Sequence, residues 1–516
     1  MSTLPLSLFV PFILLAASAL FLRRPGRRPG RLPAFAEAAA LAGMSLALAG
    51  LVQFLFVGSQ GPVAVGLLSF RLDAISLTLA LLVSFVGWVV VRYARRYLDG
   101  EGREGAFHGL ALAAVAAVLV LVQAGSLPVL VAGFVATGLL LRQLLLFYPD
   151  RAEARRAATK FTRVWGAGDV ALVLAGALLW QAYGSLDIAM LNAASAQAFP
   201  AAAQGAVVLV VLAAALKTAA FPLHGWLTEV MEAPTPVSAL LHAGIINSGG
   251  VLLITLSGLV QQSPGAMAAL VMLGGLTALF GGVVMLTQSA VKTALAWSTV
   301  AQMGFMLLQC GLGLWALALL HIAAHSLYKA HAFLASGNAV RAVNAIRKPG
   351  PVAVPGLGAV ARSFALALAL YTSVAMAFTL AVGEKSPQAL ALGAMLIFGV
   401  SYLIAQGLAD AAPGALTRRT VRASLAAALA YFGFQVVANA VWGPSLPAAP
   451  VPGPLEWALI VLAVLSFGVV AVAQALFPLW AHHPSTAGLR VHLANGLYLN
   501  AMFDRMTGGF RASTRT

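Results

Sequence analysis

The chain alternates between long apolar stretches and short polar loops over nearly its whole length. Fifteen apolar windows are each long enough to cross a hydrocarbon core of roughly 30 Å. They fall near residues 4–22, 34–57, 72–93, 106–124, 127–148, 161–183, 204–226, 237–260, 265–287, 290–311, 314–338, 360–382, 389–409, 420–442 and 455–480. Such stretches must form helices in lipid, because an isolated strand would leave its backbone groups without hydrogen bonds. The pattern predicts an all-α polytopic membrane protein of about 15 transmembrane helices, with one membrane domain over residues 1–480.

Basic residues in the loops support this count. Lys and Arg cluster after most odd-numbered windows, as at 23–31, 92–103, 151–163, 341–348 and 418–422, whereas the loops near 58–71, 184–203, 258–265 and 443–455 carry almost none. Since Lys and Arg concentrate in cytoplasmic loops, the alternation predicts an N-terminus outside and a C-terminus in the cytoplasm. The loop after the seventh window is an exception, because it carries Glu229 and Glu232 but no basic residue.

The two ends of the chain are expected to lie in or on the membrane. Residues 4–22 are interpreted as a retained first span rather than a cleaved signal, because the basic cluster follows the apolar stretch instead of preceding it. Residues 486–512 mix Leu, Tyr, Met and Phe with Arg490, Arg505 and Arg511. This mixture is typical of an interfacial helix. Residues 486–516 are therefore expected to form a cytoplasmic amphipathic helix and tail.

Composition narrows the class of protein further. Of the 516 residues, 61% are hydrophobic and only 9% are charged, whereas a soluble domain is about a quarter charged. The net charge of +16 arises mainly from arginines in short loops between apolar stretches, so no nucleic-acid partner is expected. The surface of the protein is expected to face membrane lipid. Cys310 is the only cysteine, which excludes an intrachain disulfide, an iron–sulfur cluster and a cysteine zinc site.

Lys217 is the first candidate residue, an ionisable side chain deep within the seventh apolar window. The segment FPLHGW at 221–226 interrupts the same window, and EAPTP follows at 232–236. Broken helices at membrane depth are tolerated only where protein or water lines them. A buried lysine beside such a break is a candidate proton carrier, because burial disfavours its charge and an acidic partner restores it. The alternative is a lysine that extends its amine to the membrane surface.

Histidines provide the second group of candidates. His321, His325 and Lys329 recur at intervals of four, so they share one helical face and cover roughly 12 Å of membrane depth. Histidine titrates nearest to physiological pH, which suits proton transfer. His242 lies in the eighth window and is either a further carrier or a structural hydrogen-bond donor. Zinc bound by the paired histidines is the weaker interpretation, because Lys329 would repel the cation.

Four further ionisable residues are candidates for supporting the pathway. Asp73, Asp169 and Lys292 lie at the ends of predicted spans, and Glu232 lies in the second helix break. Each is as well suited to anchoring a helix end as to supporting an ion pathway. They are retained as possible pathway or support residues.

Three motifs give the chain a family resemblance. They are FPLHGWLTEVMEAPTPVSALLHAGIINSGG at 221–250, VKTALAWSTVAQMGFM at 291–306 and HIAAHSLYKAHAFLASGNAV at 321–340. With the motifs in this order, the chain resembles the antiporter-like proton-conducting subunits of respiratory complex I and of Mrp-type cation/proton antiporters. The resemblance covers about residues 72–340. The resemblance implies that Lys217, His242, His321, His325 and Lys329 form a proton pathway.

The stretch HAGIINSGG at 242–250 resembles the DabB family of inorganic carbon transporter subunits. That resemblance implies a multi-pass protein of the bacterial inner membrane and a large DabA-type partner on its cytoplasmic face. The partner is expected to hold zinc, and this chain no cofactor. The implied action is energy-coupled accumulation of bicarbonate or CO2, driven by proton or sodium flow. The chain itself is expected to be a transporter subunit and not an enzyme.

Two departures from the family pattern are visible. The fifth helix of the family carries a glutamate that partners the pathway lysine, but residues 132–136 here read AGFVA, so the carboxylate is expected to be missing. Glu232 is a weak substitute. The family's twelfth-helix lysine is also absent between Phe364 and Val382. Two alternatives stay open: a subunit of an NADH dehydrogenase or Mrp antiporter, and a membrane scaffold without conduction.

Overall fold

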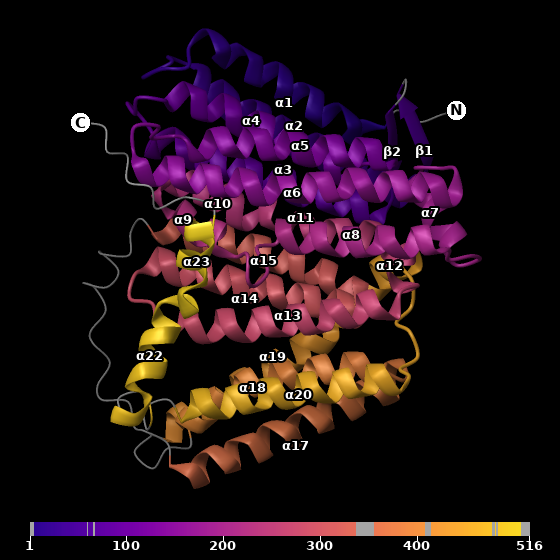
Figure 1. Cartoon of the computed structure of the whole chain (residues 1–516), viewed down its shortest axis with the longest axis vertical. Coiled ribbons are helices and arrows are strands. Elements are labelled where there is room, and N and C mark those ends of the chain that lie inside the picture. Colours follow the sequence, from indigo (N-terminus) through magenta and orange to yellow (C-terminus); the bar gives the residue numbers. More distant parts are fainter. Residues whose placement is uncertain are drawn as a thin grey trace.

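A computed structural model describes residues 5–58, 60–65, 68–336, 356–407, 414–476, 480 and 483–506. Helices lie side by side across the whole molecule, from α1 at one edge to α17 at the other (Figure 1). The first part contains α1 (Phe9–Leu20), α2 (Leu32–Val57), α3 (Ala74–Tyr97), α4 (Glu104–Val122), α5 (Leu127–Leu145), α6 (Ala152–Tyr183), α7 (Ile188–Ser195) and α8 (Ala201–Lys217).

The middle part contains the helix breaks. It comprises α9 (Gly225–Glu229), η3 (Val230–Glu232), α10 (Thr235–Ala243), η4 (Ile245–Asn247), α11 (Ser248–Thr255), α12 (Ser257–Gln261), α13 (Pro264–Met285), α14 (Val291–Gly311) and α15 (Trp315–Ser336). The last part comprises α17 (Leu357–Val382), α18 (Pro387–Gly407), α19 (Gly414–Trp442), α20 (Pro454–Ala475), α22 (Ala487–Ala494) and α23 (Leu499–Met506), with short 3-10 turns between some of them.

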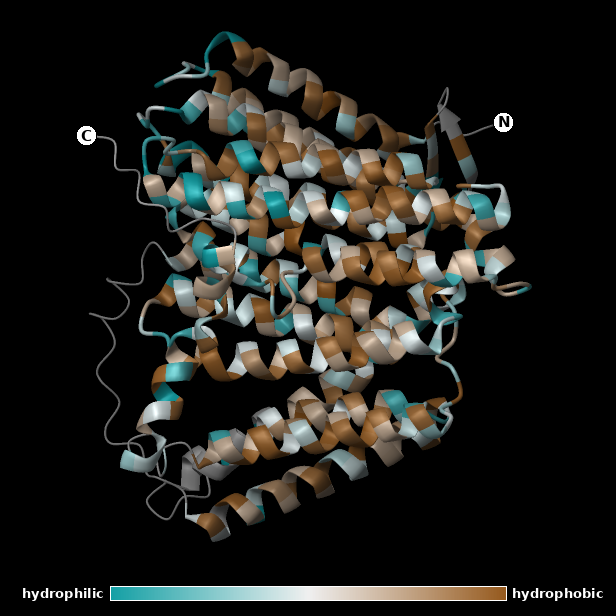
Figure 2. Cartoon of the chain, viewed as in Figure 1, coloured by the Kyte–Doolittle hydropathy of each residue, from teal (hydrophilic) through white to brown (hydrophobic). Residues whose placement is uncertain are grey.

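The predicted all-α membrane architecture is confirmed. Each apolar window coincides with a helix or a run of short helices, and among the described residues eleven helices are long and apolar enough to cross a membrane. Apolar residues fill the middle of the helices and hydrophilic residues gather at the two ends (Figure 2). The eighth window, expected as one helix, is divided at Gly244, whose φ of −122° and ψ of −78° leave the helical region. It is also the most enclosed span, with 94% of its apolar stretch buried.

A short hairpin was not predicted. Strands β1 (Gln60–Val65) and β2 (Leu68–Leu72) pair antiparallel within the loop after α2, with Val63 opposite Phe70. The backbone N–H of Arg71 also donates to the carbonyl of Gln123 at 2.9 Å. The hairpin thereby covers the end of α4, and Phe70 is buried there.

Glycines allow α13 and α14 to pack closely together. A Cβ atom on Gly274 would lie 2.4 Å from the backbone nitrogen of Leu308, and one on Gly304 would lie 2.4 Å from that of Ala278. Only glycine fits at such backbone-to-backbone approaches. Of this closely packed pair, α14 also packs against α15, which carries the predicted histidine face.

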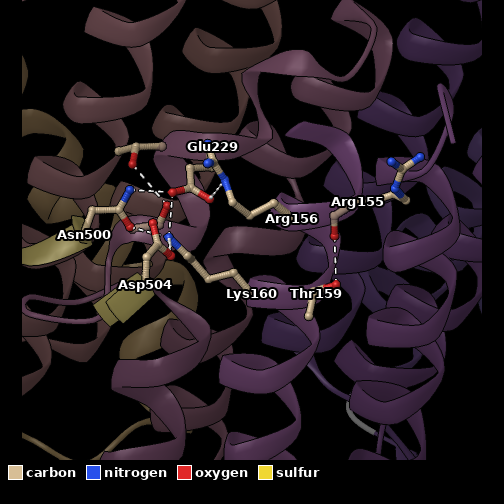
Figure 3. A network of polar contacts seen from close by, with 9 residues as sticks. Arg155, Arg156, Thr159, Lys160, Glu229, Asn500 and Asp504 are labelled. Atoms are coloured by element: carbon tan, nitrogen blue, oxygen red, sulfur yellow. Dashed lines mark hydrogen bonds and ion pairs between the residues drawn. The ribbon is translucent and has the colours of Figure 1, made fainter. Parts of the chain in front are cut away.

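The C-terminal segment is fastened to the helix bundle by an ion network (Figure 3). Over the segment expected to be amphipathic, the structure has α22 and α23 with a turn between them at Gly496–Tyr498. The ammonium of Lys160 on α6 lies 2.6 Å from Glu229 and 2.5 Å from Asp504 of α23. Asn500 accepts a hydrogen bond from Lys160 at 2.6 Å and donates one to Glu229 at 2.5 Å.

The network links three segments that are far apart in the sequence. The side chain of Lys160 is only 4% exposed and that of Asp504 7%. A buried charge that loses its partner destabilises a fold by several kcal/mol. Lys160 is therefore the residue that joins α23 to α6 and to Glu229 at the end of α9.

Substitution Lys160→Met should release α23. It removes the ammonium shared by Glu229 and Asp504 and leaves Glu229 with the more distant guanidinium of Arg156, at 3.8 Å, at a cost of about 3 kcal/mol. Hydrogen–deuterium exchange at residues 499–506 should then accelerate by on the order of a hundredfold. Arg155→Met is the matched control, because Arg155 is an exposed residue of the same helix that donates only to the carbonyl of Pro149 in the described contacts. Equal exchange rates in the two variants would contradict this role of Lys160.

Candidate functional site

Lys217 is the last residue of α8 and is completely buried. Its side chain has 0% exposure, and its ammonium lies 2.6 Å from Oδ1 of Asp169 on α6. The same ammonium lies 4.2 Å from the centre of the Trp165 ring and 4.5 Å from that of Phe134. The negative faces of these rings and the carboxylate together compensate the lysine's charge.

The backbone leaves the helix directly after Lys217. Ala219 has a positive φ of 51°, and the peptide bond between Phe221 and Pro222 is cis. The chain re-enters a helix only at Gly225. As the sequence predicted, α8 and α9 are two separate helices, and the lysine lies at the break.

Asp169 corrects two sequence-based predictions. It was placed at the end of a span, but α6 begins at Ala152, so Asp169 lies near the middle of the helix. The carboxylate partner of Lys217 was expected to be missing because α5 lacks a glutamate. The partner is instead supplied by α6, and Phe134 of α5 faces the lysine with its ring.

Gly168 makes room for this pair. A Cβ atom at this position would lie 3.3 Å from Cε and 3.4 Å from Cγ of Lys217. The glycine before Asp169 therefore lets the lysine side chain lie flat against α6. A sequence signal for the pair was present, since Asp169 is an ionisable residue inside an apolar stretch.

A second cluster lies where α10, α14 and α15 meet. Nδ1 of His242 is 3.0 Å from the hydroxyl of Thr299, and the imidazole stacks on Phe333 with ring centres 4.3 Å apart. Lys329 is fully buried, and its ammonium donates to the carbonyl of Leu295 at 3.0 Å. No carboxylate among the described residues pairs with Lys329. Its ammonium is therefore stabilised by the dipole of the Leu295 carbonyl and not by an opposite charge.

Asn247, in the short turn η4 after α10, contacts the histidine face of α15. Its Oδ1 atom lies 3.1 Å from Nδ1 of His325, and its amide donates to the hydroxyl of Ser326 at 3.0 Å. The rings of His321 and His325 have centres 6.0 Å apart. His321, His325 and Lys329 thus follow one another along α15, as their spacing predicted.

Each of the two central imidazoles has one nitrogen held and one nitrogen available. Nδ1 of His242 and of His325 are engaged as described above. The Nε2 atoms of both rings are buried and contact no hydrogen-bond partner among the described residues. An imidazole fixed through one nitrogen can exchange a proton through the other.

A cavity of about 560 Å³ adjoins His321 and His325. Gln302 and Gln309 of α14 and Tyr328 of α15 add polar groups to its lining. The space is large enough for several water molecules, each of which occupies about 30 Å³ in the liquid. Gln302 and Gln309 were not predicted as site residues, although both are polar residues in an apolar helix.

The remaining candidates lie away from both clusters. Asp73 caps the N-terminus of α3, where it accepts from the backbone N–H of Ser76 at 2.7 Å. Glu232 lies 3.5 Å from Arg151 at an exposed site, so its prediction as a counter-charge for Lys217 is wrong. Lys292 lies in the first turn of α14, outside the contacts that form the two clusters.

The two clusters are separate. No hydrogen bond or ion pair between described residues joins Lys217 to His242. They are connected by packing instead, since a Cβ on Gly249 of α11 would lie 2.5 Å from the carbonyl of Ala214 on α8, and one on Gly250 would lie 2.3 Å from Met306 of α14. Among the described residues, no three His, Cys, Asp or Glu side chains lie close enough to hold a metal ion.

Family models match most of the central chain. The model described as the transmembrane family of NADH:quinone oxidoreductase and Mrp antiporters matches residues 124–406. The N-terminal model of complex I chain 5 matches residues 67–108. Together they cover every residue of the two clusters.

Similar proteins come from two groups. A probable inorganic carbon transporter subunit DabB2 of Halothiobacillus neapolitanus is 36% identical over 91% of this chain and 87% of its own length. A probable subunit DabB of Hydrogenovibrio crunogenus is 42% identical over 51% of this chain and 52% of its own length. NADH-quinone oxidoreductase subunit L of Mycobacterium tuberculosis is 31% identical over 79% of this chain and 64% of its own.

Solved structures share the fold. A chain of the Mrp complex of Dietzia sp. DQ12-45-1b superposes with a TM-score of 0.63 at 24% identity, over 99% of this chain and 60% of its own. A chain of an archaeal membrane-bound sulfane sulfur reductase superposes with a TM-score of 0.60 at 17% identity. The match covers 96% of this chain and 99% of the reductase chain. With the sequence matches above, this chain belongs to the NADH:quinone oxidoreductase/Mrp antiporter family of membrane subunits, and within it to the DabB group of inorganic carbon transporter subunits.

Proposed function

We propose that this chain conducts protons through the bacterial inner membrane as the ion-carrying subunit of a complex that accumulates inorganic carbon. A zinc protein of the DabA type is its proposed partner on the cytoplasmic face, the side on which the distribution of basic loops predicts the C-terminus. The observation that carries the proposal is the buried pair of Lys217 and Asp169 at a helix break. The identity to a probable inorganic carbon transporter subunit over most of both chains supports the carbon substrate.

The pair is suited to act as a switch. While Lys217 and Asp169 are in contact, their charges cancel and the site is electrically balanced. When the pair opens, the ammonium is left in a low-dielectric interior, and loss of its proton removes that unfavourable charge. Movement of the segment after Lys217 is the proposed step that separates them, because residues 219–224 lie between α8 and α9 and outside either helix.

The histidine cluster is suited to pass the proton onward. His242 and His325 are each held by a hydrogen bond at Nδ1. Each also has a buried Nε2 atom that forms no hydrogen bond with a described residue. His321 borders the polar cavity next to them. A proton that leaves Lys217 is therefore proposed to reach the cavity by way of these imidazoles and Lys329.

A proton-translocating subunit of an NADH-quinone oxidoreductase or an Mrp-type cation/proton antiporter is the second candidate. The 31% identity to subunit L favours it. The two candidates differ in the proteins bound to the chain. Purification of the tagged chain from its native membrane should yield a large zinc-containing protein, detected by mass spectrometry and metal analysis. Recovery of quinone-reducing subunits instead would reject the carbon-transport proposal in favour of the second candidate.

Asp169→Asn should abolish growth in air. The substitution leaves the ammonium of Lys217 buried without a carboxylate, which raises the energy of the charged state by about 3 kcal/mol or more. The test is complementation, at ambient CO2, of a bacterium that lacks its own inorganic carbon uptake, with growth at high CO2 as the reference. Asp187→Asn is the matched control, since Asp187 caps α7 through the backbone N–H of Met190. Growth of the Asp169→Asn strain in air at a normal level of protein would reject the switch.

His325→Ala should reduce proton flux in proteoliposomes by on the order of a hundredfold, which is the contribution expected of one well-placed proton-transfer group. His331→Ala is the control, because His331 is an exposed residue of the same helix. A pH-sensitive dye inside the vesicles reports the flux. An unchanged flux in His325→Ala would favour the scaffold hypothesis over conduction.

A further inference from the structure

An apolar cavity of about 350 Å³ lies between α13, α18, α20 and α22. Its walls include Leu279 and Val283 of α13, Phe398 of α18 and Val470 of α20. Along this part of the chain the lining runs from Ala278 of α13 to Leu286, the residue after the helix, which corresponds to roughly 12 Å of membrane depth. The cavity is therefore an elongated cleft that follows the helix axes.

The cleft is unsuited to water over most of its length. A buried water molecule needs two to four polar partners. The polar residues of the lining, Thr287, Gln474, Trp480 and Arg490, are confined to the end near α22. The rest of the cleft offers only apolar contacts, as a hydrocarbon chain requires.

The end near α22 carries the residue types that meet lipid headgroups. Trp480 donates through its indole N–H to the carbonyl of Ala473 at 2.7 Å, so its ring is fixed at the mouth of the cleft. Arg490 lies on α22, whose exposed Leu489 and Val491 are typical of a helix in the membrane surface. Tryptophan and arginine at this depth favour a polar headgroup that carries negative charge.

We infer that this cleft binds one anionic phospholipid, with an acyl chain between α13 and α20 and its phosphate at Arg490. The inference does not depend on the proposed transport function. The acyl chain would fill the space that α13, α18 and α20 leave between them. The cleft and the cavity beside His321 share four lining residues, Ala278, Met395, Gly399 and Phe467. The end of the lipid's acyl chain would therefore reach the wall of that polar cavity.

Gly282 provides a sharp test, because it lines the cleft and a Cβ on it meets open space. The variant Gly282→Phe fills the cleft. The matched control is Gly275→Phe, two turns earlier on α13, where a Cβ also meets open space but the residue lines neither cavity. Arg490→Ala removes the headgroup partner, and Arg505→Ala is its control on the exposed side of α23.

The full chain is reconstituted with equal amounts of dioleoylphosphatidylglycerol and dioleoylphosphatidylcholine, extracted in mild detergent, and analysed for retained lipid by mass spectrometry. The unaltered chain should retain phosphatidylglycerol in preference. Gly282→Phe and Arg490→Ala should each retain about fivefold less of it, and both controls should behave as the unaltered chain. Equal retention in Gly282→Phe and Gly275→Phe would overturn the site, as would equal retention of the two lipids, which marks adventitious lipid only.

Discussion

A charge inside a bilayer must be balanced by a partner held close to it, and this requirement organises the protein around Lys217 and Asp169. An isolated ion in a low-dielectric interior costs several kcal/mol. Here the ammonium and the carboxylate are 2.6 Å apart. Two aromatic rings complete the surroundings of the ammonium. The pair depends on α8 ending at the lysine and on a glycine in α6 that admits its side chain.

The second cluster satisfies the same requirement by a different means. Lys329 is held by a backbone carbonyl, and the imidazoles of His242 and His325 are held as hydrogen-bonding groups by Thr299 and Asn247. One site is therefore balanced by an opposite charge and the other by dipoles. The helix pair α10–α11 packs against both, through glycines that bring its backbone close to α8 and to α14. A shift at the break after Lys217 would therefore alter the packing at the histidines without any direct contact between the two sites.

Much of this arrangement follows from local sequence pattern. Apolar windows predict the helices, because membrane thickness fixes their length. The spacing of His321, His325 and Lys329 places them on one face, since a helix repeats every 3.6 residues. The proline- and glycine-rich segment after Lys217 predicts the break.

Contacts between distant segments were not predictable in the same way. The ion pair of Lys217 joins helices whose relative rotation no periodicity fixes, and Asp169 appeared to lie at a helix end because the polar first turns of α6 hid its true start at Ala152. The contact of Lys160 with Asn500 links residues 340 positions apart. The cleft beside α22 exists only because α13 and α20 come together in space.

The claim that Lys217 and Asp169 act as one unit is tested most directly by a double-mutant cycle on proton flux, with Lys217→Met, Asp169→Asn and the two combined. If the pair is the switch, each single substitution removes most of the flux and the double variant is no worse than either one. If the losses simply add, or if either single variant conducts as well as the unaltered chain, the two residues work independently and this account is wrong.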